Sequence, residues 1–328
     1  MPELYPLLLI PIFDERPWGL HDLRPIYSRV VNEPIGESWL TWEASRVANG
    51  PLVGRTLGEL AKLFRRDLVG NASVYEDRFP LLVKFLFPGE KLSVQVHPDD
   101  EQAKKTGQLC GKTECWYVLR ADPGAQVALG LKPGVTLDQL EKAIHGKSAE
   151  DLLNWVIVHE GDMIYVDAGT VHTIGGGSIL VETQQTSDTT YRLYDYGRPR
   201  EVHIAEGLAV TKLKTSAGKV VHRAGDPSTV LVRAPYFQVE KLPMRQSLHG
   251  HVDPGSPHVL VAIEGSGVVE SHGMESISFA KGEAVVVPAA VSEYVVRPQW
   301  ELELMRMSVP TGSVAVPETT LQEFVAAR

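Results

Sequence analysis

The sequence has few cysteines, no excess of basic charge and no long apolar run. Its 328 residues include two cysteines, Cys110 and Cys115, whose spacing fits neither a CxxC pair nor a disulfide framework. The formal net charge is -9, whereas nucleic acids and anionic membranes are bound through clustered Lys and Arg. These shortages predict a protein of the reducing cytoplasm whose main partner is neither nucleic acid nor a membrane.

The opening stretch, residues 1–13, is apolar but too short and too broken to span a bilayer. Pro6 and Pro11 interrupt it, no basic segment precedes it, and a membrane-spanning helix needs roughly 20 apolar residues. We therefore expect β-structure here. With 43% hydrophobic and 22% charged residues, the composition is typical of a soluble globular protein, and the length suits two domains.

Short strands separated by turn residues are predicted for most of the chain. Its 29 glycines and 22 prolines punctuate runs that alternate in polarity or are rich in β-branched residues. Such runs occupy residues 92–97, 155–160, 162–168, 178–184, 228–234, 258–264 and 283–289. Capping signals predict a few short helices after Thr56, Thr136 and Ser148. This pattern predicts a mainly β fold, an antiparallel barrel or sandwich.

A weak internal repeat indicates two barrels in tandem. Residues 160–172, EGDMIYVDAGTVH, and residues 281–293, KGEAVVVPAAVSE, share the spacing of a glycine, a turn residue, a small residue and a final polar side chain. That final residue is His172 in the first copy and Glu293 in the second. A strand that ends in such a tight turn directs its last side chain into the mouth of a barrel.

The run LSVQVH places a glutamine and a histidine on one face of a predicted strand. Alternate residues of a strand share a face, so Ser93, Gln95 and His97 point one way and three apolar side chains point the other. A buried polar group without a partner costs roughly 1–3 kcal/mol. The polar face therefore needs water or a ligand.

Two further segments complete a candidate set of metal ligands. Alternation in GKTECWYVLR places Lys112 and Glu114 on one face, and the turn of DAGTVH supplies His172. Two His, one Glu and one Gln suit zinc or another divalent ion and leave positions for water or substrate. Taken singly, a histidine in a β-protein is more often a hydrogen-bonded structural residue than a ligand. The order of all three segments on predicted strands favours the metal site.

The second half of the chain lacks this pattern. No Gln-x-His segment occurs there, and Glu293 stands where the repeat has a histidine. His249 and His251 are spaced like a ligand pair, but their HGHVDPGSP context is typical of a turn. We expect this half to be metal-free and to serve packing, with a linker somewhere in residues 211–219. The predicted division is a catalytic metal-binding domain at 1–215 and a second, metal-free domain at 216–328.

The chain also contains the distinctive strings QVHPDD, KTECWYVL, DAGTVHTIGGG and SDTTYRLYDYGR, with RPWGL and GESWL nearer the N-terminus. Together they resemble signature segments of the type I mannose-6-phosphate isomerases, in their short bacterial form. The resemblance is strong over residues 10–210 and weak beyond them. It implies two tandem cupin, or jelly-roll, barrels with a few short helices.

The resemblance also implies a reaction and a site. Family members interconvert D-mannose 6-phosphate and D-fructose 6-phosphate, moving a proton between C1 and C2 through an enediolate. The implied metal is one Zn²⁺ per chain, with Arg192 of SDTTYR in the active site. The implied ligands are Gln95, His97, Glu114 and His172.

The catalytic base and the phosphate site are less defined. Alternation in SILVETQ makes Glu182 our expected base, with Lys112 and His97 as rivals, while a second role for Glu182 is to orient a metal-bound histidine. Arg192 can fork onto two phosphate oxygens or stabilise the enediolate. The expected contacts to substrate and phosphate are Arg192, Lys112, Lys84 and Ser93.

Two other functions fit a metal-binding barrel. A non-haem iron oxygenase would more often use two His and one carboxylate, and a non-catalytic sugar-binding cupin would keep the metal for structure alone. Gln95 and the SDTTYR segment favour the isomerase. The sequence leaves open the oligomeric state and the metal used in the cell.

Overall fold

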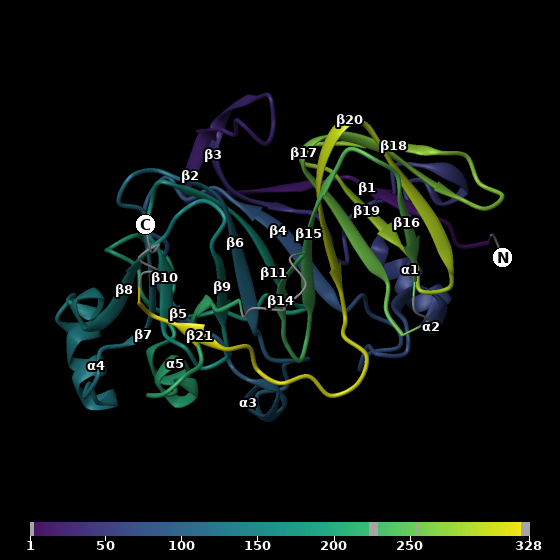
Figure 1. Cartoon of the computed structure of the whole chain (residues 1–328). Coiled ribbons are helices and arrows are strands. Elements are labelled where there is room, and N and C mark those ends of the chain that lie inside the picture. The colour runs from purple at the N-terminus through teal and green to yellow at the C-terminus, as the bar shows by residue number, and fades with distance from the viewer. Residues whose placement is uncertain (1–2, 223–228, 253–254, 323–328) are drawn as a thin grey trace. The chain divides into compact units, whose positions relative to one another are not determined.

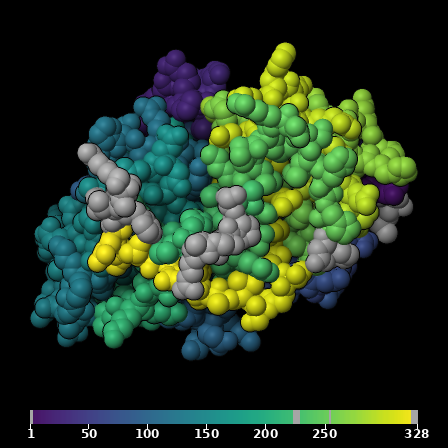
Figure 2. All heavy atoms as spheres, viewed as in Figure 1, coloured from purple at the N-terminus to yellow at the C-terminus, as the bar shows by residue number. Residues whose placement is uncertain are grey.

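Antiparallel strands are the main regular elements of the computed structural model, which describes residues 3–222, 229–252 and 255–322 (Figure 1). Figure 2 shows the atoms of the chain from the same side. The chain divides into two compact units, each assembled from separated segments. The central unit is built mainly from residues 86–221, and the split unit mainly from residues 21–85 and 222–316. No helix of the described residues has the length and apolar character needed to cross a membrane.

This division differs from the expected boundary at residue 215. The chain does pass from one unit to the other close to that point, but residues 21–85 group with the C-terminal half. Within the split unit, β1 (Leu7–Leu9) pairs with β19 (Ala284–Val287). Such pairing between distant segments leaves no local signal in a sequence, because neither segment is near the other along the chain. The expected linker at 211–219 is partly strand, since β13 (Gly218–Val220) pairs with β9 (Met163–Val166).

The central unit contains two sets of antiparallel strands around one core. One set has the order β12, β5, β10, β7, β8, and the other has the order β11, β6, β9, β13, β21. Side chains from both sets, including Trp116, Val127 and Leu180, fill the space between the two sets. The predicted mainly β fold is therefore confirmed. The bounds are β5 Val94–Val96, β6 Glu114–Ala121, β7 Gln126–Leu131, β8 Leu153–Ile157, β9 Met163–Val166, β10 His172–Ile174, β11 Ser178–Gln185, β12 Tyr191–Tyr194 and β21 Thr319–Thr320.

Short helices cover the outer face of the five-stranded sheet (Figure 1). They include α4 (Leu137–His145) and α5 (Ile204–Val210), whose apolar side chains pack against Val94 and Val96 of β5. The predicted capping box is present, because Thr136 accepts from the backbone N–H of Gln139 and the Gln139 side chain accepts from that of Thr136. Another helix, α3, spans Asp100–Lys105.

The helix predicted after Ser148 is shorter than expected and is not capped by that residue. It is a 3₁₀ turn, Ala149–Leu152, directly followed by β8. An N-cap residue usually has extended backbone angles, whereas Ser148 has φ -124° and ψ 20°. The Ser148 side chain makes no capping hydrogen bond.

The split unit has a large antiparallel sheet of its own. Its strands follow the order β1, β19, β17, β20, β15, β14, with β16 paired to β20 and β18 to β17. Helix α1 begins at the predicted cap, Thr56, which forms a capping box with Glu59. The bounds are β14 Val230–Arg233, β15 Gln238–Met244, β16 Leu248–His251, β17 His258–Ser271, β18 Ile277–Ala280 and β20 Glu293–Ser308. This unit also contains both ends of β2 Ile12–Asp22, β3 Val30–Trp39, β4 Leu81–Leu86 without its last residue, η1 Gly50–Leu52, α1 Leu57–Phe64 and α2 Arg66–Val69.

The internal repeat corresponds to two similar strand–turn–strand elements. Gly161 before β9 and Gly282 before β19 have φ values of +92° and +89°, which favour glycine. The first element leads to His172 at the start of β10, and the second leads to Glu293 at the start of β20. His172 is buried and Glu293 is exposed, so only the first element brings its last side chain inside.

Candidate metal centre and active site

Three predicted ligands meet in the interior of the central unit. His97, Glu114 and His172 are each 1% exposed, and one candidate ligand atom from each lies within 4.8 Å of the other two. The Nε2 atom of His172 is 3.3 Å from Glu114 Oε1, and the Nε2 atom of His97 is 3.5 Å from Glu114 Oε2. The arrangement suits a divalent cation with nitrogen and oxygen ligands.

Strand register explains how distant residues come together here. Gln95 of β5 lies directly opposite His172 of β10 on one side and Arg192 of β12 on the other. Residues directly opposite in neighbouring strands share a face of the sheet, so the three form one row across three strands. Val94 and Val96 point to the opposite face, as the alternation predicted, and are fully buried.

Backbone carbonyls orient both histidine rings. The Nδ1 atom of His97 is 2.9 Å from Thr189 O, and that of His172 is 2.9 Å from Thr170 O. Only a protonated Nδ1 can donate to a carbonyl, which leaves the lone pair on Nε2. Both Nε2 atoms face Glu114, as they would in a metal site whose outer partners set the ring orientation.

The side chains at the centre carry more negative than positive charge, which favours the binding of a further cation. Lys112 Nζ lies 2.8 Å from Glu114 Oε2, 3.1 Å from His97 Nε2 and 3.5 Å from Glu182 Oε1. Lys112 and Glu182 are each 4% exposed, so two buried carboxylates face one ammonium group. Glu114 Oε2 is buried and accepts no well-aligned hydrogen bond from the described residues. Since buried charge is stable only when it is compensated, these residues fit a bound divalent ion.

Burial also sets the protonation of the ligands. It lowers the pKa of His172 to about 4, against an opposing hydrogen bond to Thr170, and the positive charge of Lys112 acts in the same direction as burial. His172 is therefore neutral near pH 7, the form that binds a metal.

Burial and the nearby Glu182 and Glu114 raise the pKa of the Cys115 thiol well above its usual value. By strand alternation Cys115 faces away from Glu114, so we assign it no ligand role.

Gln95 and Ser93 lie at the edge of this centre. Gln95 Nε2 is 3.3 Å from His172 Nε2, and the Ser93 hydroxyl donates to Gln95 Oε1 at 3.2 Å. The oxygen and nitrogen of an amide can exchange places by a half-turn, and a serine hydroxyl can accept as well as donate. Ser93 can therefore support Gln95 with its oxygen directed at the metal site.

Arg192 brings positive charge to the same face. Its Nη1 atom donates to Glu201 O at 2.7 Å, while its Nε atom is buried without a hydrogen-bond partner among the described residues. Burial and the nearby Arg200 lower the pKa of Arg192, with a smaller contribution from Arg16. Arg200 itself is held by Asp195 through two hydrogen bonds of 2.6 Å and 2.7 Å. Arg192 thus has a buried donor whose hydrogen bond is not satisfied by the described residues.

Lys84 belongs to the split unit rather than to the unit that contains the ligands. Its Nζ atom is 3.0 Å from Glu37 Oε2 and 5.2 Å from the centre of the Trp39 ring, and Lys84 is 3% exposed. Glu37 also accepts from the Trp39 indole N–H at 2.8 Å. The predicted contact between Lys84 and the substrate stays a prediction.

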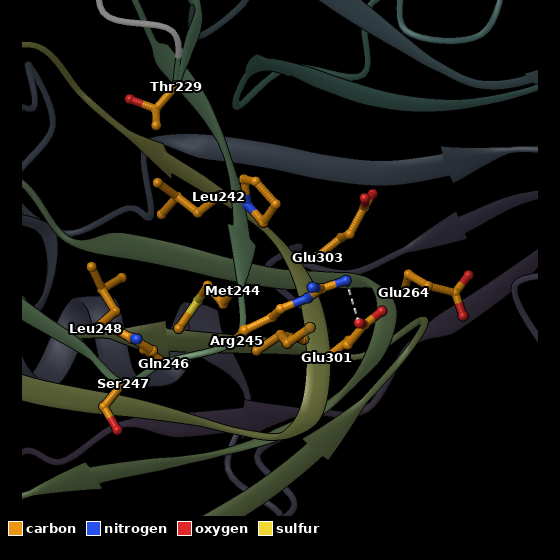
Figure 3. Close-up of a pocket in the computed structure, with 12 residues that line it drawn as sticks. Thr229, Leu242, Met244, Arg245, Gln246, Ser247, Leu248, Glu264, Glu301 and Glu303 are labelled. Atoms are coloured by element: carbon orange, nitrogen blue, oxygen red, sulfur yellow. Dashed lines mark ion pairs between the residues drawn. The ribbon is translucent and has the colours of Figure 1, made fainter.

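A cavity of about 790 Å³ in the split unit does not suit a sugar phosphate (Figure 3). Arg245 reaches across it to Glu301 at 2.6 Å, and Glu264 and Glu303 also line it. The other two glutamates are paired with lysines, Glu264 with Lys281 at 2.5 Å and Glu303 with Lys241 at 2.9 Å. Arg245, the one cationic side chain among the described lining residues, is thus already paired with a carboxylate and is not available to a phosphate.

The discounted histidines His249 and His251 lie on β16 rather than in a turn. Both are exposed side chains on a strand paired with β20. The predicted turn is therefore wrong for residues 249–251, whereas Gly255 of the same segment does lie in a turn and residues 253–254 are outside the described residues.

Comparison with known proteins agrees with this geometry. The family model described as phosphomannose isomerase type I, catalytic domain, matches residues 21–126. Mannose-6-phosphate isomerase ManA of Bacillus subtilis is 37% identical over 306 residues, 88% of this chain and 95% of its own. A mannose-6-phosphate isomerase of Streptococcus mutans is 34% identical over 304 residues, 88% of this chain and 94% of its own.

A solved structure extends the similarity to the fold. The crystal structure of the Bacillus subtilis mannose 6-phosphate isomerase superimposes with a TM-score of 0.81 at 31% identity, covering 92% of this chain and 99% of that one. A barrel of antiparallel strands with two histidines and a glutamate at its centre defines a cupin with a candidate metal site. The chain belongs to the type I phosphomannose isomerase family.

Proposed function

We propose that this chain interconverts D-mannose 6-phosphate and D-fructose 6-phosphate at a divalent metal ion, Zn²⁺, one per chain. The observation that carries the proposal is the convergence of His97, Glu114 and His172 on one buried point, beside Lys112 and Glu182. Membership of the isomerase family supports the same reaction. The proposed ligands are Gln95, His97, Glu114 and His172.

The reaction moves a proton between C1 and C2 of the sugar. A bound divalent ion supplies Lewis-acid stabilisation of the negative charge on the enediolate oxygens. Glu182 is the proposed base that takes the proton from one carbon and returns it to the other. Lys112, with Nζ 3.5 Å from Glu182 Oε1, favours the ionised carboxylate and is the rival candidate for the proton transfer.

The substrate phosphate needs cationic partners, and Arg192 is the proposed one. Two observations support this role: its Nε atom has no hydrogen-bond partner among the described residues, and the residue lies in the row with Gln95 and His172. A guanidinium can hold two phosphate oxygens at once. Contacts of the sugar phosphate with Ser93, Lys112 and Lys84 are part of the proposal. So is a cytoplasmic location, which is supported by the lack of a disulfide at Cys110 and Cys115 in the described part of the chain.

A coupled assay for fructose 6-phosphate tests this function. We expect activity with mannose 6-phosphate, its loss on chelation, and its return when Zn²⁺ is added, with elemental analysis giving one metal per chain. Oxygen consumption in the presence of Fe²⁺ and absence of isomerisation would support the oxygenase instead. Sugar binding without turnover at saturating Zn²⁺ would support the non-catalytic cupin.

A further inference from the structure

Two adjacent glutamines at the end of β11 are buried beside the metal centre. Gln184 is 0% exposed and Gln185 is 7% exposed. Glutamine is mostly a surface residue, and a buried amide usually has hydrogen bonds that compensate the loss of water. Both amide atoms of Gln185 and the nitrogen of Gln184 have such bonds, whereas Oε1 of Gln184 accepts none from the described residues. The sequence prediction gave neither residue a role, although alternation placed Gln184 on the face of Glu182.

Gln185 joins the segments that carry two of the ligands. Its Oε1 atom accepts from the backbone N–H of Thr113 at 2.9 Å, and Thr113 directly precedes Glu114. Its Nε2 atom donates to Asp100 Oδ1 at 2.9 Å, and Asp100 follows His97 closely in the chain. Both ends of one planar amide are used, so Gln185 sets the separation of the two ligand segments.

Gln184 shapes the loop that orients a ligand ring. Its Nε2 atom donates to Gln185 O at 3.0 Å and also to Ser187 O, which closes the turn after β11. Ser187 Oγ in turn accepts from the backbone N–H of Thr189 at 3.2 Å. Thr189 O is the group that holds Nδ1 of His97 at 2.9 Å. Three hydrogen bonds, through Ser187 and Thr189, therefore connect the Gln184 amide to the His97 ring.

The orientation of the Gln184 amide is determined by its partners. Both groups near Nε2 are carbonyls, which accept but cannot donate, so the oxygen and nitrogen cannot be exchanged. Gln184 also lies directly opposite Glu114 in the pairing of β11 with β6. The side chain is thus tied to the loop on one side and next to a ligand-bearing strand on the other.

We propose that Gln184 and Gln185 are positioning residues that set the affinity of this site for its divalent cation. Gln185 fixes the separation of the His97 and Glu114 segments, and Gln184 fixes the orientation of the His97 ring. The inference rests on the metal site of the proposed function. A role confined to fold stability would leave the metal affinity of the folded protein unchanged.

The test compares Gln184→Met and Gln185→Met with a matched control, Gln139→Met. Methionine keeps the length of the side chain but makes no comparable hydrogen bonds. Gln139 accepts from the N–H of Thr136 at 2.9 Å on the exposed cap of α4, far from the ligands in sequence. Zn²⁺ affinity would be measured by competition with a chromophoric chelator, and ligand geometry by the visible absorption of the Co²⁺-loaded protein, both well below the unfolding temperature.

We expect Zn²⁺ dissociation constants raised by about tenfold in both site variants, with an altered Co²⁺ spectrum, which is the lower end of the range for loss of a residue that bonds a metal ligand directly. Gln139→Met should lower only the unfolding temperature. Wild-type affinity and spectrum in folded Gln185→Met would overturn the inference. Asp100→Ala removes the partner of the same amide at an exposed position and should act in the same direction if Gln185→Met fails to fold.

These measurements need no sugar and therefore separate two failures. A wild-type chain that bound no divalent ion would refute the metal centre and this inference together. Tight binding that is equal in wild type and variants would refute the inference alone. The fructose 6-phosphate assay decides the reaction independently of both.

Discussion

The Nε2 atom of His172 lies 3.3 Å from Glu114 Oε1, although the two residues come from different sheets of the central unit. Glu114 is the one anion among the four proposed ligands, since Gln95 is uncharged and both histidines present a lone pair on Nε2. Its charge is 1% exposed and is balanced in part by Lys112. The affinity of this site for a divalent cation therefore depends on Glu114 more than on any single neutral ligand.

Glu114→Gln should weaken metal binding by more than the roughly 10–100-fold expected for loss of an outer partner. The amide keeps the shape but removes the negative charge that attracts the ion. Zinc content after gel filtration and isomerase rate at limiting Zn²⁺ would both fall. Glu160→Gln, at an exposed position, is the control and should change neither. A Glu114→Gln chain that kept its zinc would contradict this account.

Arg192→Lys should raise KM for mannose 6-phosphate by roughly 10–100-fold, because a charged hydrogen bond contributes about 1.5–3 kcal/mol and lysine lacks the guanidinium fork. The kcat value should change much less. Arg200→Lys, whose partner is Asp195, is the neighbouring control. A fall in kcat at constant KM would instead assign Arg192 to stabilisation of the enediolate.

Much of the candidate site could be predicted from strand alternation and motif order. Alternation correctly grouped Gln95 with His97 on one face, and the repeat correctly identified the turn before His172. These features are local, because residues two apart on a strand share a face wherever the strand lies. The helices capped by Thr56 and Thr136 were predictable for the same reason.

The remainder depends on contacts between distant segments. Nothing local in the sequence places Arg192 opposite Gln95, groups residues 21–85 with the C-terminal half, or connects Gln185 to both Thr113 and Asp100. Such register is set by the packing of whole sheets, which a single sequence does not reveal. The cap predicted at Ser148 is absent for a different reason, because the backbone of Ser148 is outside the extended region that an N-cap residue usually adopts.

The metal-free protein should lose stability as the pH falls from about 6.5 to about 4. Burial lowers the pKa of His172 from 6.5 to about 4, so the unfolded chain binds a proton in this window that the folded chain excludes. The contribution of this group to the unfolding free energy is therefore complete above pH 6.5 and is lost as the pH falls to about 4, by roughly 3 kcal/mol at most. Urea unfolding of the chelated protein at several pH values measures the effect, and His172→Asn should show a smaller decline. An equal decline in both would mean that other groups dominate.

Gly169→Ala should reduce both stability and metal affinity. Gly169 has φ +92°, and a Cβ atom there would lie 2.6 Å from Lys212 Cδ. Its backbone N–H also donates to His97 O at 2.8 Å, so a shift of the turn would move a ligand. We expect a loss of about 1–3 kcal/mol in unfolding free energy.

Gly161→Ala provides a matched control for that change. Gly161 has the same φ of +92°, but beyond its chain neighbours no atom of the described residues lies within 4 Å of the point that a Cβ atom would occupy. This variant should lose stability through backbone strain alone and keep its Zn²⁺ affinity. Equal metal affinities in the two folded variants, measured by chelator competition, would argue against a link between the Gly169 turn and the site.

The last prediction concerns the interior of the split unit, where Arg306 donates to both carboxylate oxygens of Glu240 at 2.8 Å and 2.9 Å. The two side chains are 19% and 11% exposed, and breaking a largely buried pair leaves an uncompensated charge. Glu240→Gln should therefore cost about 3 kcal/mol of unfolding free energy, and the double change to leucine at both positions should cost less. If this half of the chain serves packing, both variants should keep the Zn²⁺ affinity of the wild type at temperatures where they are folded. A change in that affinity would show that the split unit contributes to metal binding, and would contradict a role in packing alone.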